Sequence, residues 1–114
     1  MLPHEIKEQI LSRLTGNLNL YRVVLFGSYA AGAPGADSDI DLLVVIDDDF
    51  MPATFEENMR NYLKVSSALR DIKRKIPIDL IVHTWPMHDK FMQMGSMFSK
   101  EMARQGEVLY EKGN

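Results

Sequence analysis

Three aspartates stand beside apolar segments, where a carboxylate is costly unless it is paired, hydrated or bound to a metal. Asp39 and Asp41 are separated by one residue and precede an apolar run that ends at Ile46, and Asp79 enters the apolar segment "PIDLIV". Alternate residues of a strand share a face, so the first two carboxylates are expected on one face, about 7 Å apart. Converging carboxylates repel one another, and a divalent cation reverses the sign of that interaction. Because oxygen-only ligands favour a hard cation, the pattern predicts a Mg²⁺ site.

Gly27 and Ser28 provide the second half of such a site. They follow the β-branched and aromatic segment Tyr21 to Phe26 and begin a short stretch, Ser28 to Ala31, that is predicted to form a helical turn. Glycine lets the backbone approach a phosphate closely, and a serine at the start of a helical turn offers a hydroxyl and backbone N–H groups. A phosphate clamp that faces a two-metal carboxylate cluster is suited to in-line displacement at phosphorus. The sequence therefore predicts a magnesium–nucleotide site.

Apolar periodicity and turn residues predict the elements that position these residues. The expected order is a helix over 3–15 that stops at Gly16, a strand over 21–26, the turn over 28–31, a strand over 40–46, a helix from Thr54 to about 75, a strand over 78–83, a helical segment over 86–104 weakened by Gly95 and Ser96, and a strand over 107–110. The 40–46 strand is apolar on both faces, so both faces of the sheet are expected to be covered. The predicted fold is α/β (α+β), with one domain over 1–114 in which helices pack on a small mixed sheet.

Apolar residues form a stripe on each of two predicted helices. The helix from Thr54 carries one stripe that consists of Phe55, Met59, Tyr62, Leu63, Ser66, Leu69, Ile72 and Ile76. A second stripe consists of Phe91, Met92, Met94, Met97, Phe98 and Met102. Most of this second stripe is expected in the core, but methionine-rich surfaces also repack around partners, so an interface stays open.

The composition excludes several other classes of protein. The chain has 114 residues, a net charge of −3 and no cysteine. It therefore lacks the basic surface expected for gripping long nucleic acid, and it has neither a disulfide framework nor a thiolate metal site. No apolar run is long enough to cross a membrane and no signal peptide is evident, so a cytoplasmic location is expected. The chain also lacks a P-loop motif and the Gly-x-Gly of a dinucleotide fold.

The segment "GSYAAGAPGADSDIDLLVV" resembles the signature of the nucleotidyltransferase superfamily with the DNA polymerase β fold. That signature is Gly-Ser, ten residues and Asp-x-Asp, and the ten residues here run from Tyr29 to Ser38. The resemblance extends to the first helix, the long middle helix, the strand with the third acid and the final segment from Gly106 to Glu111. The short chain is similar to minimal nucleotidyltransferases, which lack a substrate domain and are commonly encoded beside a HEPN helical partner.

This resemblance implies an activity and a role for each matching residue. Asp39 and Asp41 would hold two Mg²⁺ ions, Asp79 would complete the first metal site and help deprotonate the attacking hydroxyl, and Gly27 and Ser28 would hold the triphosphate. The implied reaction transfers AMP, or another nucleoside monophosphate, from ATP or another NTP to a hydroxyl. The implied acceptor is a HEPN-type toxin, with this chain as its antitoxin.

One position departs from the family pattern and leaves alternatives open. Relatives often read Gly-Ser-x-Ala-Arg-Gly, whereas this chain has Ala31 in place of the arginine. The positive charge near the phosphates would then come from Arg22, from Lys64 or from the metal ions alone. The alternatives are a non-catalytic binding subunit or antitoxin, and a small-molecule transferase of the aminoglycoside-modifying type that needs a partner domain. The acceptor, the base of the NTP and a homo- or hetero-oligomeric state stay open.

The remaining polar groups are predicted to be structural. Asp47, Asp48 and Asp49 follow the second strand and are interpreted as a hydrated turn. His83 is interpreted as a satisfied or exposed histidine rather than a base, and His88 belongs to no pattern.

Overall fold

The computed structural model describes residues 2–35 and 38–113. Four strands form one sheet in the order β3-β2-β1-β4. β1 is antiparallel to both β2 and β4, and β2 is parallel to β3, so the sheet is mixed as predicted. The strands are β1 (Leu20–Phe26), β2 (Ile40–Ile46), β3 (Ile78–Thr84) and β4 (Glu107–Glu111). The helices are α1 (His4–Asn17), α2 (Gly27–Ala30), α3 (Phe55–Ala68), α4 (Arg70–Lys73), α5 (Trp85–Gln93) and α6 (Met97–Gln105).

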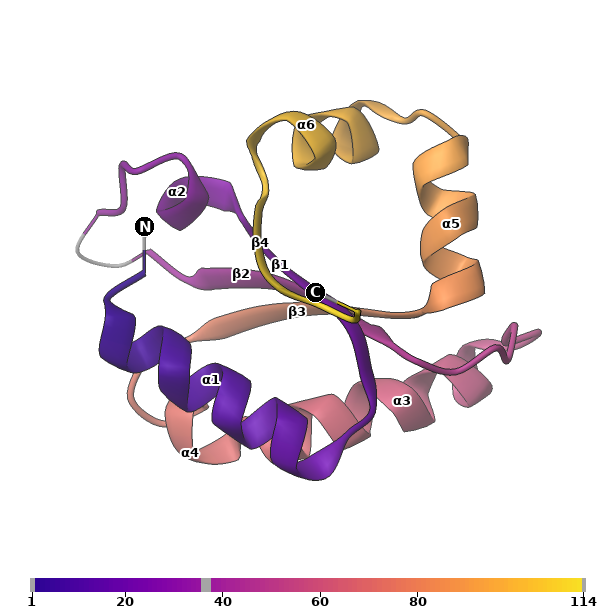
Figure 1. Ribbon diagram of the computed structural model, residues 1–114, viewed down its shortest axis with the longest axis horizontal. Helices are drawn as coiled ribbons and strands as arrows, with labels where there is room; N and C mark the ends of the chain where they lie inside the picture. The colour runs from indigo at the N-terminus through magenta and orange to yellow at the C-terminus, as the bar shows by residue number, and fades with distance from the viewer. Residues whose placement is uncertain (1, 36–37, 114) are drawn as a thin grey trace.

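Helices lie on both faces of the sheet, which confirms the α/β class. α1, α3 and α4 lie on one face, and α2, α5 and α6 lie on the other (Figure 1). The α1–α3 face has the larger core, formed by residues that include Ile10, Leu14, Val23, Leu25, Leu42, Val44, Val65 and Leu69. The α5–α6 face has a smaller core of Val24, Leu43, Val45 and Met102. Alternate residues of β2 are therefore buried on opposite faces, as its continuous apolar sequence predicts.

The strand predictions agree with the structure to within one residue at each end, and β2 has the predicted bounds. The predicted end of α1 is wrong, because the helix continues through Gly16 to Asn17. A glycine in the last turn of a helix costs only about 1 kcal/mol, so it does not force the helix to end. The helix ends where Leu18 adopts an extended backbone and donates its N–H to Leu14.

The predicted helix from Thr54 to about 75 is divided in two. Thr54 caps α3 by accepting a hydrogen bond from the backbone N–H of Glu57, at 3.2 Å. α3 ends at Ala68, and α4 follows the buried Leu69. The apolar stripe of this segment is only partly buried, because Phe55 and Leu63 are 76% and 55% exposed. α3 instead buries Asn61 and Val65.

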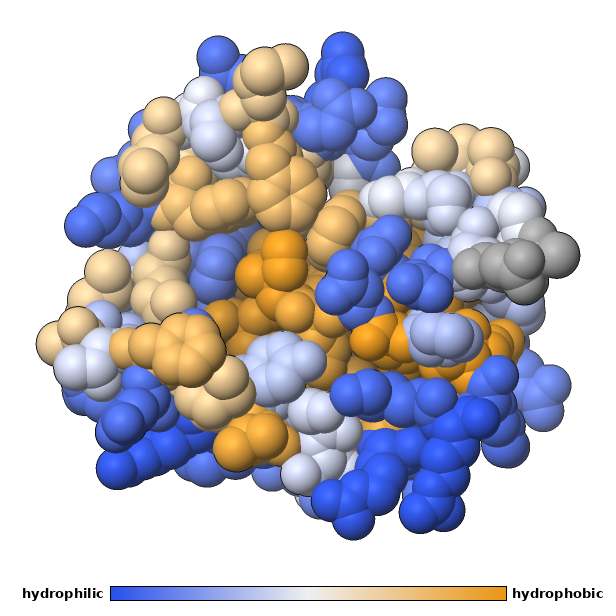
Figure 2. All heavy atoms as spheres, turned by 180° about the vertical axis from the view of Figure 1, so that it is seen from behind, coloured by the Kyte–Doolittle hydropathy of each residue, from blue (hydrophilic) through white to orange (hydrophobic). Residues whose placement is uncertain are grey.

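The segment from 86 to 104 also forms two helices. Gly95 adopts a positive φ of 63° between them, and Ser96 caps α6 by accepting from the N–H of Ser99. The core interpretation is wrong for Met94, Met97 and Phe98, which are 73%, 89% and 42% exposed, whereas Met102 is buried. Apolar side chains accordingly extend across the centre of the surface in Figure 2. Among the helices of residues 2–35 and 38–113, none has the length and apolar character needed to cross a membrane.

Candidate active site

The parallel pairing of β2 with β3 brings two of the predicted acids together. Asp41 and Asp79 are register partners on these adjacent strands. Asp39 lies immediately before β2, one residue short of its start. Partial burial, followed by the negative charges of Asp79 and Asp39, raises the pKa of Asp41. Asp79 and Asp39 are therefore each close enough to Asp41 for their charges to act on its carboxylate.

Gly27 lies directly against the Asp41 carboxylate. β1 ends at Phe26, which pairs with Asp41, and Gly27 then begins α2 with a positive φ of 73°. A Cβ atom on Gly27 would lie 2.0 Å from Oδ2 of Asp41, which is shorter than any stable contact. The sequence predicts a glycine here for close approach to a phosphate. The structure gives two further reasons, namely the left-handed backbone and the space that the carboxylate needs.

Ser28 lines a small apolar pocket beside the acids. The pocket has a volume of about 270 Å³ and lies between α2 and α6. Its walls are formed by Phe26, Gly27, Ser28, Ala31, Phe98, Glu101, Met102, Gln105 and Gly106. Phe26 and Phe98 meet edge to face, with ring centroids 5.4 Å apart. The Gly-Ser pair therefore connects the acidic cluster to a cavity with a largely apolar wall.

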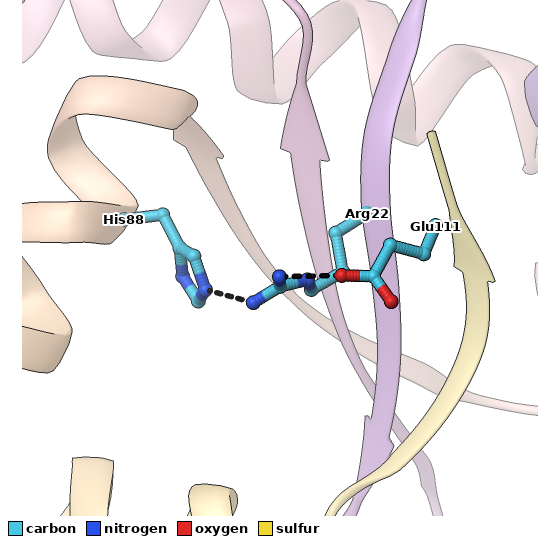
Figure 3. A network of polar contacts seen from close by, with 3 residues as sticks. All are labelled: Arg22, His88 and Glu111. Carbon is cyan, nitrogen blue, oxygen red and sulfur yellow. Dashed lines mark hydrogen bonds and ion pairs between the residues drawn. The ribbon is translucent and has the colours of Figure 1, made fainter. Parts of the chain in front are cut away.

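The structure places neither of the two suggested cations beside Gly27 and Ser28. Nη2 of Arg22 donates to Glu111 at 2.7 Å, and its Nη1 lies 3.3 Å from Nε2 of His88 (Figure 3). Arg22 is opposite Val45 in the β1–β2 ladder, far along the strand from the pair of Phe26 with Asp41. Lys64 lines a different cavity, together with residues that follow β2.

The acids offer the donor chemistry of a hard cation without forming a preformed metal site. Among the residues that the structure describes, no three acidic or histidine side chains converge closely enough to hold an ion together. Asp39, Asp41 and Asp79 nevertheless supply oxygen donors of the kind that Mg²⁺ uses with phosphate oxygens. The electrostatic cost at Asp41 also fits a cation, because a positive ion would remove the repulsion that raises its pKa.

Sequence reasoning missed the contribution of α6 to this region. Glu101 lines the Ser28 pocket and forms an ion pair with Arg104 at 2.7 Å. Through this pair, the guanidinium of Arg104 lies beside a residue of the pocket wall. The Glu-x-x-Arg spacing on a helix is a common surface pattern, so it gave no signal of a site. Only the folding of α6 over α2 makes it relevant.

Sequence reasoning also missed a buried histidine pair on the same face. His88 is 3% exposed, and its ring centroid lies 5.9 Å from that of His83. Burial and the charge of His88 lower the pKa of His83 to about 4. Burial and the charge of Arg22 lower the pKa of His88, although Asp89 opposes this shift. Both rings are therefore neutral near pH 7.

The fold and the site together define a class of protein. In this class, an aspartate pair enters one strand of a mixed sheet, a third aspartate lies on the neighbouring strand, and a Gly-Ser turn follows the adjoining strand. The model of the family described as "Polymerase beta, Nucleotidyltransferase" matches residues 8–114. The chain belongs to this family, as the sequence resemblance indicates.

Solved structures of this fold include components of toxin–antitoxin complexes. A toxin–antitoxin structure with AMP-PNP has a TM-score of 0.61 and 21% identity, covering 94% of this chain and 74% of the other. The complex of a tri-AMPylated Shewanella oneidensis HEPN toxin with MNT antitoxin has a TM-score of 0.56 and 19% identity, covering 95% and 71%. The toxin–antitoxin pair MntA–HepT has a TM-score of 0.57 and 18% identity, covering 96% and 74%. No curated protein matches the chain.

Proposed function

We propose that this chain transfers AMP from ATP to a hydroxyl group on a HEPN-type helical toxin, and that it acts as the antitoxin of the pair. The observation that carries the proposal is the register of β2 and β3. It sets Asp41 opposite Asp79, with the charge of Asp39 also felt at Asp41. Two relatives of the same fold support the choice of substrate and acceptor, because one structure contains AMP-PNP and another contains a tri-AMPylated HEPN toxin.

Each site residue has a distinct proposed role. Asp39, Asp41 and Asp79 would hold Mg²⁺, which when bound neutralises charge on the phosphates and on the attacking oxygen. Asp79 is exposed, so it is accessible to an acceptor hydroxyl and would accept its proton. Gly27 leaves room for the Asp41 carboxylate, and Ser28 would donate its hydroxyl to a phosphate oxygen. The apolar wall of the neighbouring pocket would exclude water from the reacting phosphate.

The proposal includes the setting of the reaction. Residues 1–114 would act as one nucleotidyltransferase domain, and the helical partner would supply the acceptor hydroxyl and a surface that positions it. Its substrate, ATP, favours a cytoplasmic location. A hetero-oligomer with the toxin is the assembly that this reaction needs.

Nucleotidyl transfer is tested by measuring which phosphate of ATP is transferred. Host lysate is incubated with Mg²⁺ and with ATP labelled at either the α- or the γ-phosphate, using the wild type, Asp41→Asn and Asp71→Asn. The last variant removes the same charge on α4, where the carboxylate forms an exposed ion pair with Arg13, at 3.8 Å. Nucleotidyl transfer predicts that α-label, but not γ-label, appears on one protein band with the wild type and Asp71→Asn, and is absent with Asp41→Asn. Label on small molecules instead would favour the aminoglycoside-type reaction.

Binding without turnover is the second candidate function. The observation that favours it is Ala31, because no lysine or arginine lines the pocket beside Ser28 among the residues that the structure describes. A binding subunit would capture the helical partner from the same lysate, and no label would appear on protein or on small molecules. In an active enzyme, Ala31→Arg would raise the rate of labelling, whereas a pure binding subunit would stay inactive.

A further inference from the structure

A large polar cleft opens at the end of the sheet opposite the acids of the proposed active site. Its volume is about 730 Å³, which is within the usual range for ligand sites. The end of β2, the segment that joins α1 to β1, the middle of α3 and the start of α5 form its walls. The segment that connects β2 to α3 projects beyond the sheet at this end (Figure 1).

The lining of the cleft is acidic. Asp47, Asp48 and Asp49 lie in its wall, with Lys64 as the one cation among the lining residues. Asp47 is paired with Lys112, and Oδ1 of Asp48 accepts the N–H of Phe50 at 2.9 Å. Asp49 forms no ion pair with any residue that the structure describes. The cleft therefore presents carboxylate charge that its own residues only partly neutralise.

A buried amide provides a second and independent sign of a ligand. Asn61 is 8% exposed and lines the cleft from the middle of α3. Within residues 2–35 and 38–113, its side chain has no hydrogen-bond partner. Its amide is not sealed from solvent but faces the cleft, so its oxygen and its N–H groups are available to a polar group that enters from outside. Asn61 therefore adds a neutral hydrogen-bonding group to the acidic wall of the cleft.

The remaining features narrow the chemistry of that group. Trp85 lines the cleft, and a tryptophan face attracts organic cations, most often guanidinium groups. Carboxylates and amide oxygens accept the several N–H donors of a guanidinium at once. Phe50 and Met51 follow Asp49 directly and are 43% and 46% exposed, which suits an apolar chain around the charged group.

We propose that this cleft binds an arginine side chain carried by a peptide segment of a partner protein. The guanidinium lies between Asp49, the Asn61 amide and Trp85, and the neighbouring residues of the peptide cover Phe50 and Met51. Arginine is one of the residues enriched at the hot spots of protein interfaces, where it fills a well-packed pocket of the partner. The inference concerns a different surface from the proposed active site and does not depend on nucleotidyl transfer.

Trp85 is the only tryptophan of the chain, so its fluorescence reports on the cleft directly. Wild-type protein is titrated with an acetylated and amidated Leu-Arg-Leu tripeptide, with the same peptide containing citrulline in place of arginine, and with spermidine. We expect a saturable change with the arginine peptide and about tenfold weaker binding of the citrulline peptide, because the charge-assisted hydrogen bonds are lost. Spermidine binding as tightly as the arginine peptide would overturn the peptide assignment in favour of a polyamine.

Three variants and one control test the assignment of residues. Asp49→Asn and Asn61→Ala are each expected to weaken binding of the arginine peptide about threefold to tenfold, in the range of one ordinary hydrogen bond. Lys64→Met is expected to strengthen it, because a competing positive charge is removed, and a misfolded variant could not give this gain. Asp71→Asn, which changes the same charge on α4, is expected to bind like the wild type. The proposal is overturned if no titration changes Trp85 fluorescence, or if Asp49→Asn and Asp71→Asn behave alike.

Discussion

Gly27 is the residue at which backbone conformation and site chemistry meet. A Cβ at this position has no space beside Oδ2 of Asp41, and the backbone has a positive φ. Gly32 has nearly the same φ, 76°, but nothing lies within 4 Å of a Cβ there. Substitutions at the two glycines therefore distinguish the effect of backbone strain, which both share, from the effect of displacing the Asp41 carboxylate, which only Gly27 has.

Gly27→Ala is expected to destabilise the protein and abolish transfer, whereas Gly32→Ala is expected only to destabilise it. An alanine in the left-handed region costs about 1–2 kcal/mol, and both variants share this cost. Gly27→Ala must also move Asp41. Urea unfolding measures the shared cost, and α-labelled ATP measures the difference in activity. Equal activity in the two variants would contradict the close contact of Gly27 with Asp41.

Asp41→Asn is expected to abolish transfer and to stabilise the metal-free protein near pH 7. The folded-state pKa of Asp41 is raised above its ordinary value of 3.8 by burial and by the neighbouring charges. A raised carboxyl pKa means that stability is lost as the pH rises through the window from 3.8 to the folded-state pKa. The asparagine removes this loss. Thermal unfolding in EDTA at pH 7 should therefore give a higher Tm than the wild type, and a clearly lower Tm would contradict the clustered acids.

At the scale of elements, α3 shows how the core is selected. Leu63 and Leu69 both belong to the stripe predicted from hydropathy, yet Leu63 is 55% exposed and Leu69 is fully buried. Leu69→Ala is expected to reduce the free energy of unfolding by about 2–5 kcal/mol, as for other buried leucines. Leu63→Ala is expected to change it by less than about 0.5 kcal/mol, because it leaves no cavity. Denaturant unfolding of both variants measures the difference, and similar losses would mean that α3 has the rotation predicted from hydropathy.

The strands were predictable from the sequence, but the rotation of the helices was not. Every residue of β2 except Asp41 is apolar. This sequence therefore predicts both the strand and the packing of helices on both faces of the sheet. α3 carries apolar residues around much of its circumference, and the contact with the sheet decides which of them are buried. Asn61 is the clearest case, because hydropathy predicts that this polar residue is exposed, whereas it is buried. The same reasoning explains why Met94 and Met97 were wrongly expected in the core.

At the scale of the whole molecule, the two ends of the sheet carry different chemistry. The carboxylates of Asp41 and Asp79 lie at one end of the β2–β3 pair, and the acidic cleft that includes Asp49 lies at the other. The fixed spacing from Gly27 to Asp41 made the first site predictable from sequence. The cleft was not predictable, because Asn61 and Trp85 line the same cleft as Asp49 only through the packing of α3 and α5 on the sheet. Sequence alone therefore interprets Asp47 to Asp49 as a hydrated turn.

The histidine pair should give the whole molecule a measurable pH dependence. The pKa of His83 falls from 6.5 to about 4 on folding, so the unfolded chain takes up a proton first as the pH falls. Stability is then lost between pH 6.5 and about 4, at up to about 1.4 kcal/mol per pH unit for one histidine. His88 adds in the same direction, and Asp41 opposes the loss at the acidic end of the window.

His83→Leu isolates this effect. The substitution removes a buried Nδ1 that has no partner among the described residues, and the leucine would pack against Phe91, whose ring lies 5.2 Å from that of His83. We expect the variant to be at least as stable as the wild type at pH 7 and to lose less stability between pH 6.5 and 5. His4→Gln removes an exposed histidine and serves as the control, which should follow the wild type. If His83→Leu keeps the full wild-type slope, the acid sensitivity arises from His88 or from another group, and His83 is hydrated and free to take up a proton in the folded protein.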